Sequence, residues 1–488
     1  MALNPSSTQH ERRWLILALL GVAQLMVVLD ATIVNIALPS AQQALGFSNG
    51  SRQWIVTAYA LAFGSLLLVG GRVGDLFGRK RALIVGLGGF AVMSALAGFA
   101  QSFDVLVAAR ALQGAFGALL APSALSILTT TFRDPEERGR AFGIYGAIAG
   151  GGGAIGLLLG GVLTEFLDWR ATMFVNLAFA LPAALAASAL LVNERPAIRP
   201  KLDVGGTLAG SGGLFALVYG FANAQTHGWG AALTIGALAA AAVLLSLFLA
   251  LQARGRHPLL PLRVILDRDR GGSYLAVGIT GAGMFGVFLF LTYYLQQTLG
   301  FTPLRSGLAF LPLMGAIVLT ATIVSTRVLP RTGPRPLIPT GMTLAAVAMM
   351  LLTRVGVHTS YASHVLPALL VSGVGMGLIF APAMATATGQ VRPEDAGVAS
   401  ALVNTMQQIG GSIGTALLST FAATAASGYV LAHGGPSRAI LAGAAVHGYS
   451  TAFWWSAGIF LVGALLTSVL LRPGVQELDP AATPALAH

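Results

Sequence analysis

Two charged side chains lie deep within apolar stretches of this sequence, and they are the residues best placed to do chemistry. Asp30 lies in the first apolar stretch and Arg110 in the fourth. A charge inside a membrane is costly unless it is paired, hydrated or, for a carboxyl group, protonated. Burial disfavours the charged form of a carboxyl group, and a neighbouring cation favours it. This opposition makes Asp30 a candidate proton-binding group. The alternative is a permanent structural ion pair with Arg110.

Arg110 is the only cation that the sequence places inside an apolar stretch, so it also needs a partner. Gln113 follows three residues later and lies on the same helical face. A purely structural role for Arg110, in hydrogen bonds to helix ends, is the alternative. The chain has no cysteine, and its eight histidines form no pair at helical spacing, so we expect no metal site and no cofactor.

Fourteen apolar stretches, each about 18–27 residues long, position these groups, and each can cross the roughly 30 Å of membrane hydrocarbon as a helix. Hydrophobic residues make up 55% of the chain and charged residues only 9%, against roughly 25% charged in soluble domains. Continuous apolar runs exclude a β-barrel. The expected spans are 14–37, 53–71, 82–100, 104–130, 140–164, 170–192, 204–222, 231–253, 273–297, 306–329, 336–354, 363–388, 397–424 and 449–471.

The loops between the spans alternate between rich and poor in positive charge. With both termini in the cytoplasm, 22 of the 28 Lys and Arg residues fall on the inner side and five on the outer side. This distribution follows the positive-inside rule and predicts an even number of spans. The net charge of +11 is therefore a signal of membrane topology and not of nucleic-acid binding. We expect a multi-pass protein of the cytoplasmic membrane that is a monomer. Its expected partners are lipid, protons and a small-molecule substrate, and no nucleic acid.

The sequence also contains an internal repeat. Residues 72–86 align with 327–341, so that Arg72 matches Arg327 and Gly78 matches Gly333. Residues 135–139 and 152–156 match 393–397 and 410–414. Spans 1–6 and 9–14 are thus parallel repeats, which is a transporter architecture with a site between the halves. No cluster of catalytic groups is present, so we do not expect an enzyme.

These patterns predict an all-α membrane protein with two six-helix bundles and an inserted hairpin. The predicted divisions are a cytoplasmic N-terminus at 1–13, a first bundle at 14–192, a linker and hairpin at 193–272, a second bundle at 273–471 and a cytoplasmic tail at 472–488.

The loop after the second span carries the most specific motif, which runs from Gly71 to Leu83 as GRVGDLFGRKRAL. It resembles the cytoplasmic loop signature of the major facilitator superfamily. Glycines permit a tight turn and close helix approach, and a carboxylate favours the N-terminal end of a neighbouring helix. The resemblance implies a conformational latch, and the alternative is a solvated positive loop. The residues of the expected latch are Gly71, Asp75, Gly78, Arg79 and Lys80.

Further segments resemble the fourteen-span drug:proton antiporter family within that superfamily. They are LDATIVNIALP at 29–39, RALQG at 110–114, YYLQ at 293–296 and part of the glycine-rich motif of span 5, in which Leu157 replaces the family's proline. The resemblance covers nearly the whole chain. It implies the major facilitator fold and assigns Asp30 to proton coupling, with Arg110 as its neighbour.

Polar and aromatic side chains on the spans expected to line the transport path are candidate substrate contacts. Asn404 and Gln408 belong to a polar stripe with Gln407, for which hydrogen bonding between helices is the alternative. Aromatic linings suit flat, lipophilic or cationic molecules, although any single ring could equally face lipid. The other candidates are Asn35, Trp54, Tyr59, Gln113, Tyr145, Tyr293 and Tyr294.

The sequence therefore predicts a secondary transporter driven by the proton gradient that exports lipophilic or cationic small molecules. The sequence contains no nucleotide-binding motif of the P-loop type, which argues against an ATP-driven pump. One alternative is a transporter of the same fold for another solute, such as a secreted metabolite or amino acid, without strict proton antiport. A pore or a non-transporting membrane receptor is the alternative from another class.

Overall fold

The structure is a computed structural model that describes residues 5–48, 51–132, 134–192, 203–255, 258–389, 391, 395–435 and 437–474. Every regular element within these ranges is a helix. The chain divides into two compact units. One comprises Met1–Leu251, Phe288–Leu311 and Thr415–Ser419, and the other comprises Gln252–Val287, Pro312–Gly414 and Thr420–His488.

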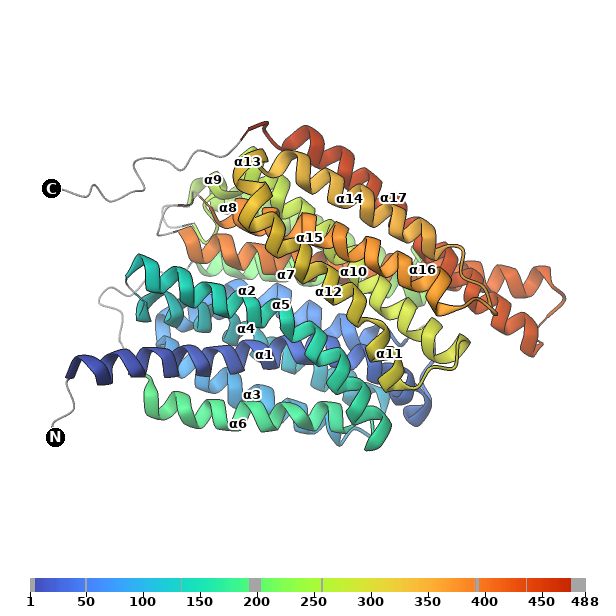
Figure 1. Ribbon diagram of the computed structural model, residues 1–488, viewed down its shortest axis with the longest axis horizontal. Coiled ribbons are helices and arrows are strands. Elements are labelled where there is room, and N and C mark those ends of the chain that lie inside the picture. The colour runs from blue at the N-terminus through green and yellow to red at the C-terminus, as the bar shows by residue number, and fades with distance from the viewer. Residues whose placement is uncertain are drawn as a thin grey trace. The chain divides into compact units, whose positions relative to one another are not determined.

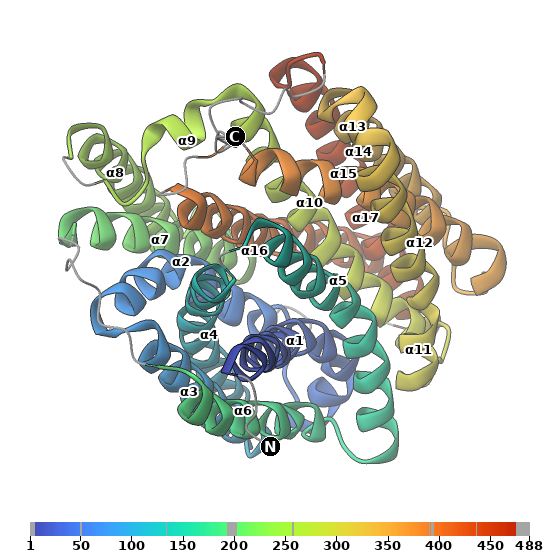
Figure 2. The ribbon, with the colours of Figure 1, turned by 60° about the vertical axis from the view of Figure 1, so that its left-hand side comes forward.

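The first unit is built around a long, apolar first helix. Its elements are α1 (Pro5–Leu45), α2 (Trp54–Phe77), α3 (Arg79–Gly98), α4 (Phe103–Thr131), α5 (Pro135–Phe166), α6 (Ala171–Leu190), α7 (Val204–His227), most of α8 (Ala232–Arg254), the π-helix η1 (Tyr294–Thr298) and α11 (Pro303–Ala309). Helix α1 packs against α4, α5 and α6, and Figure 2 shows α1 nearly end-on among them. Helix α3 packs against α4 and α6, so α1, α3, α4 and α6 meet around a common interior.

The second unit contains the remaining helices. They are α9 (Leu262–Leu266), most of α10 (Arg268–Tyr293), most of α12 (Leu311–Ile323), η2 (Val324–Val328), α13 (Leu329–Thr332), α14 (Pro334–Leu352), η3 (Tyr361–Val365), α15 (Leu366–Thr388), most of α16 (Ala396–Ala432) and α17 (Arg438–Leu470). Helix α14 packs between α15 and α17 (Figure 1). The α14–α15 interface is close because Gly341 and Gly375 face each other. A Cβ on either glycine would overlap the other's carbonyl oxygen.

Twelve helical segments among the described residues are long and apolar enough to cross a membrane. The apolar parts of α2 and α5, Trp54–Leu67 and Gly151–Phe166, are shorter than that criterion. The sequence-based expectation of an all-helical membrane protein is confirmed. The number fourteen and the cytoplasmic location of both termini stay predictions.

The internal repeat is visible in the backbone. Gly78 ends α2 with φ +96°, and Gly333 ends α13 with φ +71°. This left-handed region is strained for residues with a Cβ, so a glycine is favoured at both turns. The two glycines that match in the sequence repeat therefore make the same kind of turn before α3 and before α14.

Candidate functional site

Four helices of the first unit bring five polar side chains together at one buried place. Asp30 comes from α1, Ser94 from α3, Arg110 and Gln113 from α4, and Asn176 from α6. Arg110 and Gln113 are three residues apart, which places both on the face of α4 that contacts α1. Asp30 is 0% and Arg110 1% exposed. We call these five residues the Asp30 network.

The Asp30 carboxylate accepts three hydrogen bonds within this network. Arg110 Nη1 donates to Oδ2 at 2.6 Å. Gln113 Nε2 and Asn176 Nδ2 donate to Oδ1 at 2.9 Å and 2.8 Å. Both oxygens of a buried carboxylate therefore have donors, which is the condition for keeping a charge away from water.

The donors are themselves held in place. Ser94 Oγ accepts from Gln113 Nε2 at 2.9 Å and from Asn176 Nδ2 at 2.8 Å, and it donates to the Met173 carbonyl at 3.0 Å. Arg110 Nη1 also donates to Gln113 Oε1 at 2.8 Å. Each side-chain amide group thus points one hydrogen at Asp30 and the other at Ser94.

Two further groups flank the Asp30 network. The guanidinium of Arg110 lies over the ring of Tyr59 at 4.4 Å from its centroid, and Arg110 Nε donates to the Ile55 carbonyl at 3.4 Å. A cation over an aromatic face is stabilised by the ring quadrupole, most strongly when it is desolvated. Arg110 therefore keeps polar partners on α2 in addition to Asp30.

Asn176 contributes an acceptor that nothing in the described residues uses. Its Oδ1 is buried and has no hydrogen-bond partner. A neutral carboxyl group differs from a carboxylate in having a proton to donate. Asn176 could accept that proton after its side-chain amide turns, so the Asp30 network has groups suited to either protonation state of Asp30.

Ser94 and Asn176 are not among the site residues predicted from the sequence. Asn176 is the only Asn, Gln or charged residue within α6, and this isolation on an apolar helix could have pointed to a role in the site. Ser94 gave no signal, because serine is common in membrane helices that pack closely.

The other predicted substrate residues that carry polar groups have contacts or environments of their own. Asn35 donates to the Ala31 carbonyl of its own helix at 3.1 Å, and Asn404 likewise donates to Ser400 at 3.2 Å. The Tyr145 hydroxyl donates to Gln24 Oε1 at 2.7 Å. Gln408 Oε1 is buried without a hydrogen-bond partner among the described residues.

Two predicted aromatic residues have partners on neighbouring elements of the first unit, and a third is buried. The Trp54 ring lies 6.0 Å from that of Tyr219 on α7. The Tyr293 hydroxyl donates to Gln42 Oε1 at 2.7 Å, and its ring lies under the Arg52 guanidinium at 3.8 Å. Tyr294 is fully buried.

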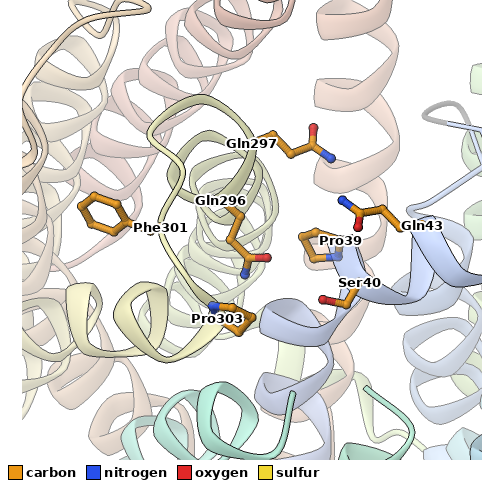
Figure 3. Close-up of a pocket in the computed structure, with 7 residues that line it drawn as sticks. All are labelled: Pro39, Ser40, Gln43, Gln296, Gln297, Phe301 and Pro303. Atoms are coloured by element: carbon orange, nitrogen blue, oxygen red, sulfur yellow. The ribbon is translucent and has the colours of Figure 1, made fainter. Parts of the chain in front are cut away.

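The same region of the first unit holds a polar pocket of about 480 Å³ beside α1 and η1. Figure 3 shows the amides of Gln43, Gln296 and Gln297 around it. Gln296 Nε2 also donates to the Ile36 carbonyl of α1 at 3.0 Å. The lining is completed by Pro39, Ser40, Phe301 and Pro303. None of the predicted substrate residues lines this pocket.

The two basic residues of the expected latch donate to backbone carbonyls, Lys80 at the C-terminus of a helix and Arg79 within the last two turns of another. Lys80 Nζ donates to the carbonyls of Ser188 and Leu191 at 2.6 Å each, which caps α6. Arg79 Nη1 donates to the Ser126 carbonyl of α4 at 3.5 Å. A Cβ added at Gly71 would meet the Pro122 side chain at 3.6 Å, which is an ordinary van der Waals contact. The backbone of Asp75 is helical, and its side chain lies outside the described part of the structure. A cation at a helix C-terminus is favoured by the helix dipole.

The fold and the Asp30 network define the class of protein: a multi-pass helical membrane protein with an ion pair buried inside one of its units. The sequence model of the Major Facilitator Superfamily matches residues 20–415, and the chain belongs to that family. It is therefore a membrane transporter and not an enzyme. Within the described ranges, no three His, Asp or Glu side chains are grouped so that they could hold a metal ion.

Relatives and a solved structure agree with this assignment. The chain is 48% identical to the puromycin resistance protein pur8 of Streptomyces alboniger over 96% of this chain and 93% of the relative. It is 38% identical to the cephamycin export protein CmcT of Amycolatopsis lactamdurans over 96% and 95%. The crystal structure of an auto-inhibited POT family peptide transporter matches with a TM-score of 0.69 over 96% and 98%, at 16% identity, which shows the shared fold.

Proposed function

We propose that this protein exports antibiotic-like small molecules from the cytoplasm in exchange for protons. The observation that carries the proposal is the fully buried Asp30 carboxylate, held by Arg110, Gln113 and Asn176 from two other helices. The names of the two relatives, which refer to puromycin resistance and cephamycin export, support the substrate class.

Protonation of Asp30 changes how α1 is joined to its neighbours. As a carboxylate, Asp30 ties α1 to α4 through Arg110 and to α6 through Asn176. A proton removes the negative charge and with it the ion pair, while Arg110 keeps Gln113 Oε1, the Ile55 carbonyl and the Tyr59 ring. The link between α1 and α4 is therefore weaker in the protonated state, which gives a proton a means to favour one conformation.

The proposal includes the predicted topology. We infer fourteen spans, two six-helix bundles at 14–192 and 273–471, a hairpin within 193–272, and cytoplasmic segments at 1–13 and 472–488. The shorter apolar parts of α2 and α5 belong to helices of 24 and 32 residues, which are long enough to span. We place the protein in the cytoplasmic membrane as a monomer that uses no cofactor. In this scheme, the loop at Gly71–Lys80 acts as the latch.

Transport by the purified protein in proteoliposomes tests the proposal. An inside-acidic pH gradient should drive uptake of puromycin into liposomes that carry the transporter, and a proton ionophore should abolish the accumulation. Empty liposomes are the control. Saturable uptake that ignores the gradient would instead indicate a facilitator without proton antiport, and uptake that does not saturate would indicate a pore.

A further inference from the structure

Three consecutive residues near the N-terminal end of α1 join this helix to three different neighbours. Arg12 Nε and Nη2 donate to the carbonyl of the last residue of α6, at 3.3 Å and 2.9 Å. Arg13 Nη1 forms an ion pair with Glu137 Oε2 of α5 at 3.2 Å. The Trp14 ring centroid lies 5.4 Å from that of Phe132, the residue that follows α4. We call Arg12, Arg13 and Trp14 the α1 collar.

The geometry of a helix explains why three residues in a row can do this. Successive side chains point about 100° apart at 3.6 residues per turn, so the collar reaches three sides of α1. Figure 2 shows α1 nearly end-on among α4, α5 and α6. All these helices belong to the same compact unit. The collar therefore attaches one end of α1 to its neighbours within that unit.

Side chains of α1 thus contact α4 and α6 at two levels. At the collar, Arg12 binds the end of α6 and Trp14 contacts the end of α4. At the Asp30 network, Asp30 binds Asn176 of α6 and Arg110 of α4. About 17 residues separate the two levels, which is about 25 Å along the helix axis. A proton on Asp30 removes the ion pair at the second level and leaves the collar contacts in place.

The second unit repeats part of this arrangement on its own first long helix. Arg268, the first residue of α10, follows Arg12 by 256 residues, an offset between the 255 and 258 that relate the aligned segments of the sequence repeat. Its Nη2 donates to the carbonyl of the penultimate residue of α17 at 2.8 Å. Asp395, which matches Glu137 in the repeat, accepts two hydrogen bonds from Arg263 at 3.0 Å each.

The two first helices differ in what they carry beyond this attachment. Helix α1 carries Asp30 near its middle, whereas the only acid of α10 is Asp269, its second residue. A role in holding the helices of one unit together would be common to Arg12 and Arg268. A role in proton coupling can belong only to the attachment of α1, because α10 has no acid at depth.

We propose that the α1 collar is the fixed point about which α1 moves when Asp30 gains or loses its proton, and that its three members are positioning residues for proton coupling. With the N-terminal end held, a weaker link to α4 displaces the part of α1 beyond Asp30. Without the collar, α1 relaxes as a whole, and the two protonation states differ less in structure. A proton shifts a conformational equilibrium only as far as the two states differ in free energy. This inference rests on the proposed export function.

Proton release per transported puromycin, measured with the purified full-length protein in proteoliposomes, tests the inference at one fixed pH. The collar variants are Arg12→Gln, Arg13→Gln and Glu137→Gln. The last of these keeps every positive charge of α1, so the charge signal that orients the first span is unchanged. Arg268→Gln is the matched control, because it removes the same kind of bond from a helix without a deep acid.

We expect the number of protons released per puromycin to fall roughly twofold to fivefold in each collar variant, as suits partly exposed charged contacts. Exchange of puromycin down its own gradient should persist, and Arg268→Gln should keep the wild-type ratio. Arg13→Glu should lower the ratio as well. Arg13→Glu with Glu137→Arg should restore it, because the ion pair forms again in reverse.

A wild-type ratio in all collar variants would overturn the inference. An equal loss in Arg268→Gln, or lowered thermal midpoints with an unchanged ratio, would also overturn it, because the collar would then serve folding alone. A reversed pair that does not restore the ratio excludes the Arg13–Glu137 contact as a positioning bond. A wild type that transports puromycin without releasing protons contradicts the proton exchange in the proposed function itself.

Discussion

Asn176 shows how a neutral residue can control a buried acid. It donates one amide hydrogen to Asp30 and the other to Ser94, and its own oxygen is unpartnered. A hydrogen bond to a carboxylate favours the charged form. Asn176 therefore belongs to the chemistry of Asp30 although it carries no charge.

Replacing Asn176 with leucine should weaken proton coupling. Asn176→Leu keeps the volume but leaves the Asp30 carboxylate with two donors instead of three and removes the hydrogen bond that joins α1 to α6. Substrate-induced proton release should fall by roughly tenfold, since a hydrogen bond to a charged group is worth about 1.5–3 kcal/mol. The measurement is proton release from reconstituted protein at one fixed pH and at matched amounts of folded protein.

Asn223→Leu is the matched control for this substitution. Asn223 is also buried and lies on α7, where it donates to Thr234 at 2.8 Å. The control should leave proton release unchanged. Wild-type release from both variants would show that Asn176 has no part in proton coupling.

At the residue scale, the sequence could predict Asp30, Arg110 and Gln113 but not the other two members of the site. Asp30 and Arg110 stand out because charges are rare and costly inside membrane spans. The roles of Ser94 and Asn176 depend on how α3 and α6 pack against α1 and α4. A single sequence does not contain that information, since polar neutral residues occur in many membrane helices for packing alone.

At the scale of helices, glycines set how closely α2 and α4 approach. A Cβ on Gly114 would overlap the Tyr59 carbonyl oxygen, and one on Gly70 would overlap the Ala118 carbonyl oxygen. Close backbone contact of this kind replaces hydrophobic burial as the cohesive force between helices in lipid. It also fixes the position of Tyr59 under Arg110.

Gly114→Ala should therefore destabilise the protein, while Gly88→Ala should not. The added methyl at Gly114 meets backbone, which cannot move aside, whereas nothing lies within 4 Å of the position at Gly88. We expect Gly114→Ala to cost about 1–3 kcal/mol, as overpacking does, and to lower the thermal midpoint in detergent. Equal midpoints for the two variants would contradict a close backbone contact between α2 and α4.

The turn between α2 and α3 carries a further prediction. Asp75→Asn removes the only acid of the loop motif but keeps its size, so the transport cycle should slow while substrate affinity stays within twofold. Turnover in proteoliposomes and equilibrium binding in nanodiscs separate the two quantities. A variant with wild-type turnover would exclude a latch role for Asp75.

The helices themselves were largely predictable, and their interruptions were not. The apolar runs predicted the helices, because lipid offers the backbone no hydrogen-bond partners and a helix satisfies its own backbone groups. The sequence did not reveal that span 9 ends in the π-helix η1, or that span 10 is divided into α11, α12 and η2.

At the scale of the whole molecule, topology is open to direct measurement because the chain contains no native cysteine. Single cysteines at Ser6 and Ala487 should both react with a membrane-impermeant maleimide only from the cytoplasmic side, in inside-out vesicles. A cysteine at Thr359, in a predicted outer loop, should react only in right-side-out cells. Termini that label from opposite sides would contradict an even number of spans.

The central claim is that Asp30 carries the proton that is exchanged for substrate, and substrate-induced proton release from reconstituted protein tests it most directly. Asp30→Asn keeps the size of the side chain but leaves the buried charge of Arg110 without its carboxylate partner. Asp30→Asn with Arg110→Gln removes both charges and controls for loss of folding. Asp30→Glu keeps the carboxyl group.

At matched amounts of folded protein, we expect proton release from the wild type, reduced release from Asp30→Glu, and none from Asp30→Asn or the double variant. Substrate exchange down its own gradient should persist, since exchange need not move protons. Wild-type release of protons from Asp30→Asn would contradict the account and would move the search for the coupling acid to Glu165 and Asp168.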